Sequence, residues 1–393
     1  MRTYDWIVIG GGMTGAALSY ELAQQQFSVL LIEQSATLQG ATRFSYGGVA
    51  YWSGTTELTQ QLCQEGRQRY DDLAAELDAE IYFRELDLLL TVSADRDPST
   101  LASTHTTYAI PPHFLSVAAA CELEPLLNPA AIAGAFTVRH GQVDPEAMTL
   151  AYRQAFVRAG GTLVVDTVTG LQQQGQRVTG AIATQHTYSA ANVVVCAGGW
   201  SRALLTRAGV PVPLYFTHAE LVETPPVGLK LRTLVMTAEM QRFQMEAQAS
   251  TSDREQQWQQ PGLELAPWIL DAGVVQLANG SLRMGQISRV LSNPQATVDA
   301  IASETAIRNA VGKVLPTLQD FPGQWQHCLV AFSRDRLPLI GAVPETTGLH
   351  VFSGFSNPFA IAPPLAQRFA QVASGSTDPI LTQVSPLRFA AIA

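Results

Sequence analysis

The first 33 residues alternate between apolar segments and a glycine-rich turn in a definite order. Residues 7–9 predict a buried strand, residues 16–24 predict a helix, and residues 29–32 predict a second buried strand. The glycine-rich turn, residues 10–15, lies between the first strand and the helix, and Glu33 follows the second strand. This order predicts a strand, turn, helix and strand that form one parallel unit.

A loop of small residues, 39–48, follows this unit. Leu58, Leu62, Leu73 and Leu77 then recur with a helical pattern. Glycine-rich loops let the backbone approach a bound molecule, so we expect residues 39–48 to lie near a ligand.

The segment Asp144-Pro145-Glu146 predicts a helix start, because it supplies a capping acid, a proline at the first position and an acid in the first turn. Gly160 and Gly161 end that helix. Strands are predicted after it over residues 162–165, 180–184 and 188–195.

Residues 211–324 differ in character and predict a second domain that contains a sheet. A polar, glutamine-rich loop lies near residues 253–260, and a helix is predicted over 297–315. The predicted strands of this region cover 214–223, 268–276 and 281–287. A strand over 349–352 and a closing helix to about residue 374 return the chain to the first domain.

Composition narrows the functional classes. The chain has 393 residues, of which 47% are hydrophobic and 15% charged, which is typical of a globular, soluble protein. A net charge of −9 leaves no basic surface, so we expect neither a nucleic-acid partner nor an obligatory membrane partner. Lys230 and Lys313 are the only lysines, so arginine, which binds carboxylates through two hydrogen bonds, carries almost all of the positive charge.

The four cysteines, Cys63, Cys121, Cys196 and Cys328, are far apart and form no CxxC pair. This spacing argues against a disulfide-relay enzyme and against a metal site, and it fits a reduced, cytoplasmic setting. The N-terminal apolar segment is too short to span a bilayer, and we expect no targeting segment.

The N-terminal unit has the residues that a dinucleotide requires. Gly10 permits the tight turn, Gly12 lets the backbone approach a pyrophosphate, and Gly15 lets the helix pack on the strand. Glu33, 18 residues after Gly15, can accept a hydrogen bond from a ribose hydroxyl and disfavours a phosphorylated ribose. No second motif of this kind occurs, so we expect the substrate to supply electrons directly.

With these motifs the chain resembles the FAD-dependent D-amino-acid oxidase superfamily, especially the branch that contains glycine oxidase and monomeric sarcosine oxidase. The resemblance covers nearly the whole chain. It rests on the glycine motif with Glu33, the loop at 42–48, Val143-Asp144-Pro145, the turn at 197–200, and the segment 334–341 that precedes Gly354.

The resemblance implies an α/β fold with a Rossmann-like FAD-binding domain and an inserted α+β substrate domain on a mixed or antiparallel sheet. The implied FAD-binding domain covers residues 1–85, 140–212 and 325–393, and the substrate-binding domain covers 86–139 and 213–324.

FAD is the implied cofactor, with its flavin placed where the inserted domain meets the nucleotide domain. The turn at 354–357, leading into a helix, would direct N–H groups at the flavin, whose reduced form carries negative charge. The alternative is a purely structural turn from strand to helix. The implied cofactor-binding residues are Gly10, Gly12, Met13, Thr14, Gly15, Glu33, Gln34, Thr42, Arg43, Phe44, Gly47, Gly48, Val168, Ala197, Gly198, Trp200, Cys328, Gly354, Phe355, Ser356 and Asn357.

Cys328 resembles in position the cysteine through which monomeric sarcosine oxidase attaches its flavin, so the resemblance implies a possible thioether bond. Two observations favour the alternative of a free cysteine. Isolated cysteines are usually small buried hydrophobic residues, and glycine oxidase holds its flavin without a bond.

The chain departs from the family where the substrate would bind. Val330 stands where glycine oxidase has an arginine for the substrate carboxylate, and the turn at 354–359 has no charge. Arg43 and Arg283 are the candidate replacements, although Arg283 could equally be an exposed strand arginine. His218 is a third catalytic candidate, and Tyr46 and Tyr215 are further groups that could face the substrate.

The resemblance implies an enzyme that oxidises the C–N bond of a small amine or amino acid by hydride transfer to flavin N5, which gives an imine. Oxygen or an external acceptor would reoxidise the flavin. Two alternatives stay open: a C–O dehydrogenase, such as one for 2-hydroxy acids, and a non-catalytic flavin-binding subunit.

Overall fold

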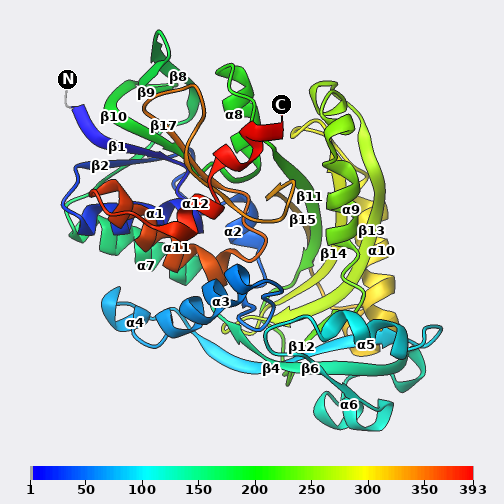
Figure 1. Ribbon diagram of the computed structural model, residues 1–393. Helices are drawn as coiled ribbons and strands as arrows, with labels where there is room; N and C mark the ends of the chain where they lie inside the picture. Colours follow the sequence, from blue (N-terminus) through cyan, green and yellow to red (C-terminus); the bar gives the residue numbers. More distant parts are fainter. Residues whose placement is uncertain (1–2, 393) are drawn as a thin grey trace.

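The computed structural model describes residues 3–392 and contains two β-sheets with helices packed on them (Figure 1). The first sheet has the strand order β16-β17-β10-β1-β2-β7, and the antiparallel pair β8-β9 is joined to β10. Its strands are β1 Thr3–Ile9, β2 Val29–Glu33, β7 Thr162–Val165, β8 Val168–Gln174, β9 Arg177–Ala183, β10 Thr187–Val195, β16 Leu339–Ala342 and β17 Leu349–Ser353. The central strands pair in parallel, which confirms the α/β prediction.

Both faces of the first sheet are buried, because successive side chains of β1 enter different cores. Trp6 and Val8 pack on the side of α1 (Met13–Gln24), α7 (Pro145–Arg158) and α11 (Pro358–Ala373). Ile7 and Ile9 pack on the other side, with residues of α8 (Ser201–Arg207). The first predicted strand is therefore a central strand that holds the glycine turn in place.

Helix α7 begins where the sequence predicts it. The Asp144 carboxylate accepts hydrogen bonds from the N–H groups of Glu146 at 3.0 Å and Ala147 at 2.9 Å. Pro145 occupies the first helical position, where its missing N–H costs no hydrogen bond.

The second sheet has the strand order β15-β11-β14-β13-β12-β4-β6-β3, with β5 paired to β6. Its strands are β3 Gly48–Val49, β4 Arg84–Ser93, β5 His113–Leu115, β6 Ile132–Gln142, β11 Leu214–Glu223, β12 Leu234–Thr237, β13 Glu264–Gln276, β14 Leu282–Leu291 and β15 Gln324–Ser333. All neighbours are antiparallel except β12 and β4, so the sheet is mixed. Helix α10 (Ala300–Val314) packs on one of its faces (Figure 1).

The chain crosses between the two sheets several times. β15 pairs with β11 along ten registered positions in the second sheet, although the sequence division places residues 325–393 in the FAD-binding domain. The domain boundaries themselves stay a prediction. The remaining helices are α2 Gly40–Phe44, α3 Glu57–Arg69, α4 Leu73–Glu76, α5 Ser99–His105, α6 Val117–Leu123, α9 Arg242–Ala249 and α12 Pro379–Gln383. Within residues 3–392, no helix is long and apolar enough to cross a membrane.

Candidate active site

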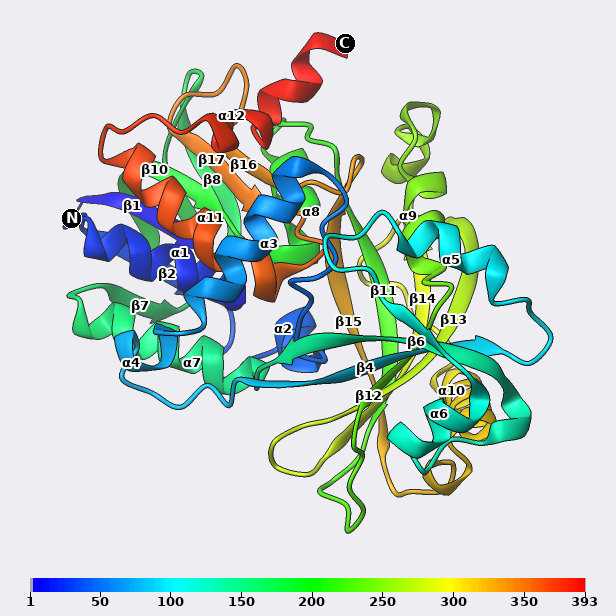
Figure 2. The same cartoon turned by 60° about the horizontal axis from the view of Figure 1, so that its bottom comes forward.

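A cavity of about 1050 Å³ is lined by residues from both sheets. One end is bounded by the glycine turn after β1, the end of β2 and the start of β8. The other end is bounded by the second sheet, on the face opposite α10. Helix α2 lies beside β15 where the two sheets approach each other (Figure 2).

The glycine turn has the shape that a dinucleotide requires. A Cβ on Gly15 would lie 1.8 Å from the carbonyl oxygen of Gly10, so only glycine allows α1 to pack on β1 here. Gly12 and Met13 line the cavity at the start of α1, and the Met13 N–H donates to Thr42 Oγ1 at 3.0 Å. Amide groups at a helix start favour a phosphate, so these residues fit the diphosphate of FAD.

Glu33 is fixed at the end of β2 and faces the cavity. Its Oε2 accepts the Gly11 N–H at 2.6 Å and lies 3.6 Å from Arg153 Nη2. Arg153 Nε in turn donates to the Gly11 carbonyl oxygen at 2.8 Å. The carboxylate thus has a fixed position beside the glycine turn, as the assignment to a ribose hydroxyl requires.

Most of the sequence-predicted cofactor residues line the cavity. Gly15, Arg43 and Gly47 are the exceptions: Gly15 packs against Gly10, and a Cβ on Gly47 would lie 2.1 Å from the Val143 carbonyl oxygen. The predicted residues that line the cavity are Gly10, Gly12, Met13, Thr14, Glu33, Gln34, Thr42, Phe44, Gly48, Val168, Ala197, Gly198, Trp200, Cys328, Gly354, Phe355, Ser356 and Asn357.

The turn before α11 is held rigidly at the cavity. Gly354 has φ +80°, and a Cβ there would lie 2.8 Å from Leu214 Cδ2. Asn357 Nδ2 donates to the Ala50 carbonyl oxygen at 3.0 Å, and Pro358 starts the helix. The start of α11 therefore points at a fixed place in the cavity wall, where its amides favour negative charge.

Cys328 lines the cavity from β15, paired with Ala219 of β11. The residue is 7% exposed, and burial raises the pKa of its thiol to about 12. Its position fits the predicted neighbourhood of the flavin. The two alternatives for Cys328, a thioether bond and a free cysteine, both stay open.

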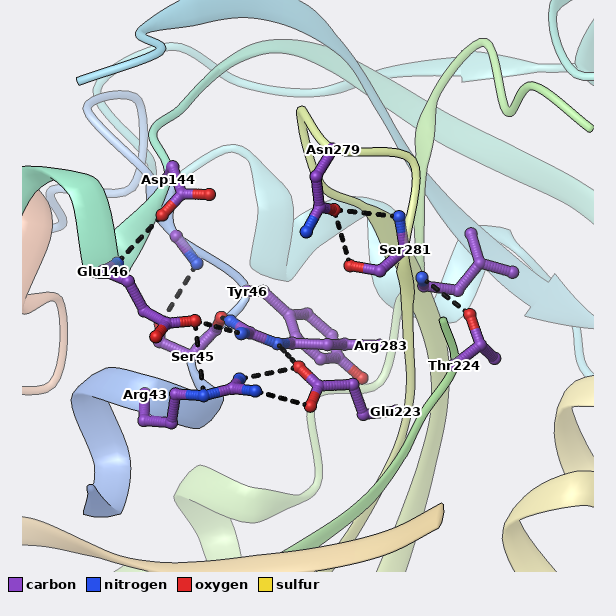
Figure 3. A network of polar contacts seen from close by, with 12 residues as sticks. Arg43, Ser45, Tyr46, Asp144, Glu146, Glu223, Thr224, Asn279, Ser281 and Arg283 are labelled. Atoms are coloured by element: carbon purple, nitrogen blue, oxygen red, sulfur yellow. Dashed lines mark hydrogen bonds and ion pairs between the residues drawn. The ribbon is translucent and has the colours of Figure 1, made fainter. Parts of the chain in front are cut away.

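The structure places both predicted catalytic arginines, Arg43 and Arg283, in an ion-pair network instead of the cavity wall (Figure 3). Arg43 donates from Nη1 and Nη2 to the two Glu223 carboxylate oxygens at 2.7 and 2.8 Å, and its Nε lies 3.2 Å from Glu146. Arg283 is 0% exposed and pairs through Nε with Glu223 at 3.0 Å and through Nη1 with the Ser45 carbonyl oxygen. Arg283 is therefore not an exposed strand arginine, and both guanidinium groups already have acidic partners.

His218 also lies outside the cavity wall. Ala219 and Leu221 of β11 face the cavity, so His218, one residue before Ala219, points to the opposite face of the sheet. Its ring stacks on His327 with centroids 4.8 Å apart, and its Nδ1 lies 3.6 Å from Glu220 Oε1. Because side chains alternate between the two faces of a strand, His218 lies away from the cavity, and its predicted position beside the substrate is corrected.

Tyr215 and Tyr46, the other groups expected near the substrate, differ in their placement. The Tyr215 hydroxyl donates to Glu255 Oε2 at 2.7 Å, and the residue does not line the cavity. Tyr46 does line it, and its buried hydroxyl has no hydrogen-bond partner among residues 3–392.

His140 was not predicted, although it lines the cavity from the end of β6. The Trp52 indole N–H donates to its Nδ1 at 3.0 Å, so Nε2 carries the proton of the neutral ring. A Cβ on Gly48 would lie 2.8 Å from Nε2, which places that N–H beside the start of β3. Burial lowers the pKa of His140 to about 4, so the ring is a neutral donor at pH 7.

Arg242 and Asp271 were also missed, although both line the cavity. Arg242 starts α9 in a segment whose sequence has no strong helix start, and Asp271 lies in the middle of β13. The sequence separates them by 29 residues, so only the fold brings them together.

Known proteins resemble this chain along much of its length. A family profile described as DAO, FAD dependent oxidoreductase, matches residues 5–372. Glycine oxidase of Geobacillus kaustophilus (strain HTA426) is 27% identical over 229 residues, which are 56% of this chain and 61% of that protein. Mitochondrial sarcosine dehydrogenase of Homo sapiens is 28% identical over 236 residues, which are 56% of this chain and 25% of that protein. The aligned region thus spans less than two thirds of either relative.

Solved structures show the same fold. The crystal structure of the Geobacillus kaustophilus glycine oxidase has a TM-score of 0.77 at 22% identity and covers 98% of both chains. The L-proline dehydrogenase from P.horikoshii also has a TM-score of 0.77, at 18% identity, and covers 99% of this chain and 98% of that chain. The Rossmann-like architecture expected from the sequence is thereby confirmed.

Proposed function

Because the chain belongs to the DAO family of FAD-dependent oxidoreductases, we propose that it oxidises the C–N bond of a small amine or amino acid to an imine. Three of its relatives are named as a glycine oxidase, a sarcosine dehydrogenase and a 4-methylaminobutanoate oxidase. The imine would then hydrolyse in water. FAD, when bound, supplies the acceptor for the hydride that leaves the carbon next to nitrogen.

A single continuous cavity carries this proposal. It connects the glycine turn and Glu33 with a largely apolar wall on the second sheet. Leu88 and Leu90 of β4 and Leu234 and Met236 of β12 contribute to that wall. The cavity therefore offers a small molecule a place beside the flavin position, where apolar side chains exclude water.

The protein's own contribution is orientation and electrostatics. The start of α11 directs amide groups at the cavity, which favours the negative charge of a reduced flavin. The Nε2–H group of His140 adds an uncharged hydrogen-bond donor to the part of the cavity wall that contains Gly48. Neither group needs to change its protonation state during the reaction.

Anaerobic reduction of the reconstituted protein tests this function. The purified chain is loaded with FAD and mixed with amines and amino acids, and in parallel with 2-hydroxy acids and glycerol 3-phosphate. We expect the visible absorbance of the flavin to bleach with members of the first group. A dithionite-treated sample shows that the flavin can be reduced.

Bleaching by hydroxy acids or glycerol 3-phosphate alone would show that the protein oxidises a C–O bond instead of a C–N bond. A flavin that dithionite reduces but that no compound of either group bleaches would contradict the proposal. Admission of oxygen after bleaching identifies the acceptor: rapid recovery of the absorbance with hydrogen peroxide indicates an oxidase, and slow recovery indicates an external acceptor.

A further inference from the structure

Arg242 presents a partly unused guanidinium group to the cavity. Its Nε donates to Glu246 Oε1 at 2.7 Å, and the same oxygen accepts the Thr217 hydroxyl at 2.6 Å. Glu246 is buried, so this chain of contacts anchors Arg242 to β11. Among residues 3–392, the guanidinium group of Arg242 is ion-paired with Glu246 and donates a hydrogen bond from Nε, while Nη1 and Nη2 donate none. These two nitrogens form the planar fork that binds a carboxylate.

Asp271 presents the opposite charge to the same part of the cavity. Its two carboxylate oxygens accept the N–H groups of Gln241 and Arg242 at 3.4 Å each, which places Asp271 at the start of α9. These contacts are long, and within the described residues no ion pair joins Asp271 to an arginine. Asp271 therefore keeps the capacity to accept a hydrogen bond or a proton from a ligand.

The two charges are surrounded by apolar side chains and a few polar groups. Leu221, Leu234 and Met236 line this part of the cavity from β11 and β12, and the polar side chains of Thr237 and Gln286 line it from β12 and β14. The Tyr46 hydroxyl, which is buried without a partner among residues 3–392, interacts electrostatically with Asp271. A cation, an anion and an apolar wall together match the carboxylate, the amine and the side chain of an amino acid.

We propose that Arg242 binds the substrate carboxylate through Nη1 and Nη2, and that Asp271 accepts a proton from the substrate ammonium group. The substrate is then an α-amino acid, or its N-alkyl derivative, with an apolar side chain that contacts the leucine wall. This assignment rests on the proposed C–N oxidation and names the substrate class for it.

The proton transfer is needed because an ammonium nitrogen has no lone pair to stabilise the developing C=N bond. One N–H bond of the substrate breaks, one O–H bond forms on Asp271, and the nitrogen keeps the electron pair. Burial raises the pKa of Asp271, which makes its carboxylate a better proton acceptor. The charged and titratable groups around it are Arg242 and Glu239 near α9 and Tyr46 after α2.

Binding of an unreactive acid tests Arg242 without any turnover. The probe is 4-methylpentanoate, which has the carbon skeleton of leucine but no amine, and calorimetry measures its affinity for the FAD-loaded protein. We expect Arg242→Gln to weaken binding by at least about tenfold, because a charged hydrogen-bond pair is lost. Arg242→Lys keeps the charge but not the fork, and should weaken binding less.

Turnover tests the substrate class and Asp271. The substrates are both enantiomers of leucine and of N-methylleucine, with 3-methylbutylamine as the matched compound without a carboxylate. Arg242→Gln should raise KM for the amino acid but not for the amine. Asp271→Asn should lower kcat by about a hundredfold while the affinity for 4-methylpentanoate stays the same.

The pH profile separates a proton acceptor from a merely structural acid. In the wild-type protein, kcat/KM should fall as the pH drops through the pKa of Asp271, because the protonated carboxyl cannot accept a proton. Asp271→Asn should lose this acidic limb, and Asp271→Glu should restore part of it. A profile that keeps its acidic limb in Asp271→Asn would overturn the role of Asp271.

The surface pair Arg139 and Asp87 on β6 and β4, 3.1 Å apart, supplies matched controls. Arg139→Gln and Asp87→Asn should leave binding and turnover unchanged, and the visible flavin spectrum shows that each variant is folded. Equal affinity for 4-methylpentanoate in wild type and Arg242→Gln, or no binding by the wild type, would overturn the proposal. If no amine or amino acid of the panel reduces the flavin, the C–N oxidation fails, and the calorimetry still decides whether Arg242 binds a carboxylate; if other amino acids reduce it but leucine and N-methylleucine do not, the proposed substrate class is overturned.

Discussion

The two ends of the cavity are built by different means. At the nucleotide end, Gly10, Gly12 and Gly15 make the site by having no side chain. At the second-sheet end, the proposed site is made by the charges of Arg242 on α9 and Asp271 on β13. The first end is therefore sensitive to added volume, and the second to changed charge. A substitution at the nucleotide end should therefore alter the FAD content of the protein, and a substitution at the second-sheet end should alter its substrate preference.

Gly15→Val should have the largest effect at the nucleotide end. The new Cβ would lie 1.8 Å from the Gly10 carbonyl oxygen, so α1 must move away from β1. We expect loss of FAD binding, and a fall of the unfolding free energy by at least about 3 kcal/mol. FAD content by absorbance and Tm by calorimetry are the measurements.

Gly170→Ala is the matched control on β8, because a Cβ there meets no atom within 4 Å. It should keep both the FAD content and the Tm of the wild type. Normal FAD binding by Gly15→Val would contradict the role of close backbone contact at this end.

Glu223→Gln should destabilise the network that joins α2 to the second sheet. Arg283 is 0% exposed, and without the Glu223 carboxylate its charge stays buried with reduced compensation. We expect a loss of about 4 kcal/mol of unfolding free energy, measured by urea denaturation.

Asp87→Asn, which removes the acid of an exposed pair, should cost less than about 1 kcal/mol. Equal losses in the two variants would show that Arg283 finds another partner. The comparison also separates this network from Arg242, whose removal should in addition change substrate binding.

The nucleotide end could be predicted from the sequence because its residues are local. The glycine turn, the start of α1 and Glu33 fall within 24 residues, from Gly10 to Glu33, and their spacing follows from one strand, one turn and one helix. The resemblance to the family then located Val168 and Gly354, which line the cavity as expected.

The second-sheet end could not be predicted in the same way, because pairing of distant strands decides which side chains meet. Arg43 and Glu223 are 180 residues apart, so no local pattern indicates that their charges neutralise each other. His218 was expected beside the substrate, but strand pairing, which composition does not reveal, decides which side chains of β11 face the cavity. His140 and Asp271 went unnoticed because a single polar residue in a strand carries no signal of its own.

His140 makes a smaller, pH-dependent contribution to stability. Its folded pKa of about 4 lies below the ordinary value of 6.5, so folding favours the neutral ring. The stability from this group is fully present above pH 6.5 and is lost as the pH falls toward 4. We expect the difference to amount to roughly 3 kcal/mol, measured as the unfolding free energy at successive pH values.

His140→Gln should flatten this part of the stability curve, although His350, whose pKa burial also lowers to about 4, keeps some of the slope. His113→Gln, an exposed residue of β5, is the control and should leave the curve unchanged. An unchanged slope in His140→Gln would show that the ring is not held neutral between Trp52 and the cavity.

Cys328→Ala should have the smallest effect, although the residue lies in the cavity wall. Burial raises the pKa of its thiol to about 12, so the thiolate that a thioether-forming or alkylating reaction needs is scarce near neutral pH. We therefore expect acid to release all of the flavin from the wild-type protein, and Cys328→Ala to cost about 1 kcal/mol of unfolding free energy. Yellow colour that stays with the precipitate, and that Cys328→Ala abolishes, would instead establish the thioether and would place the flavin ring against β15.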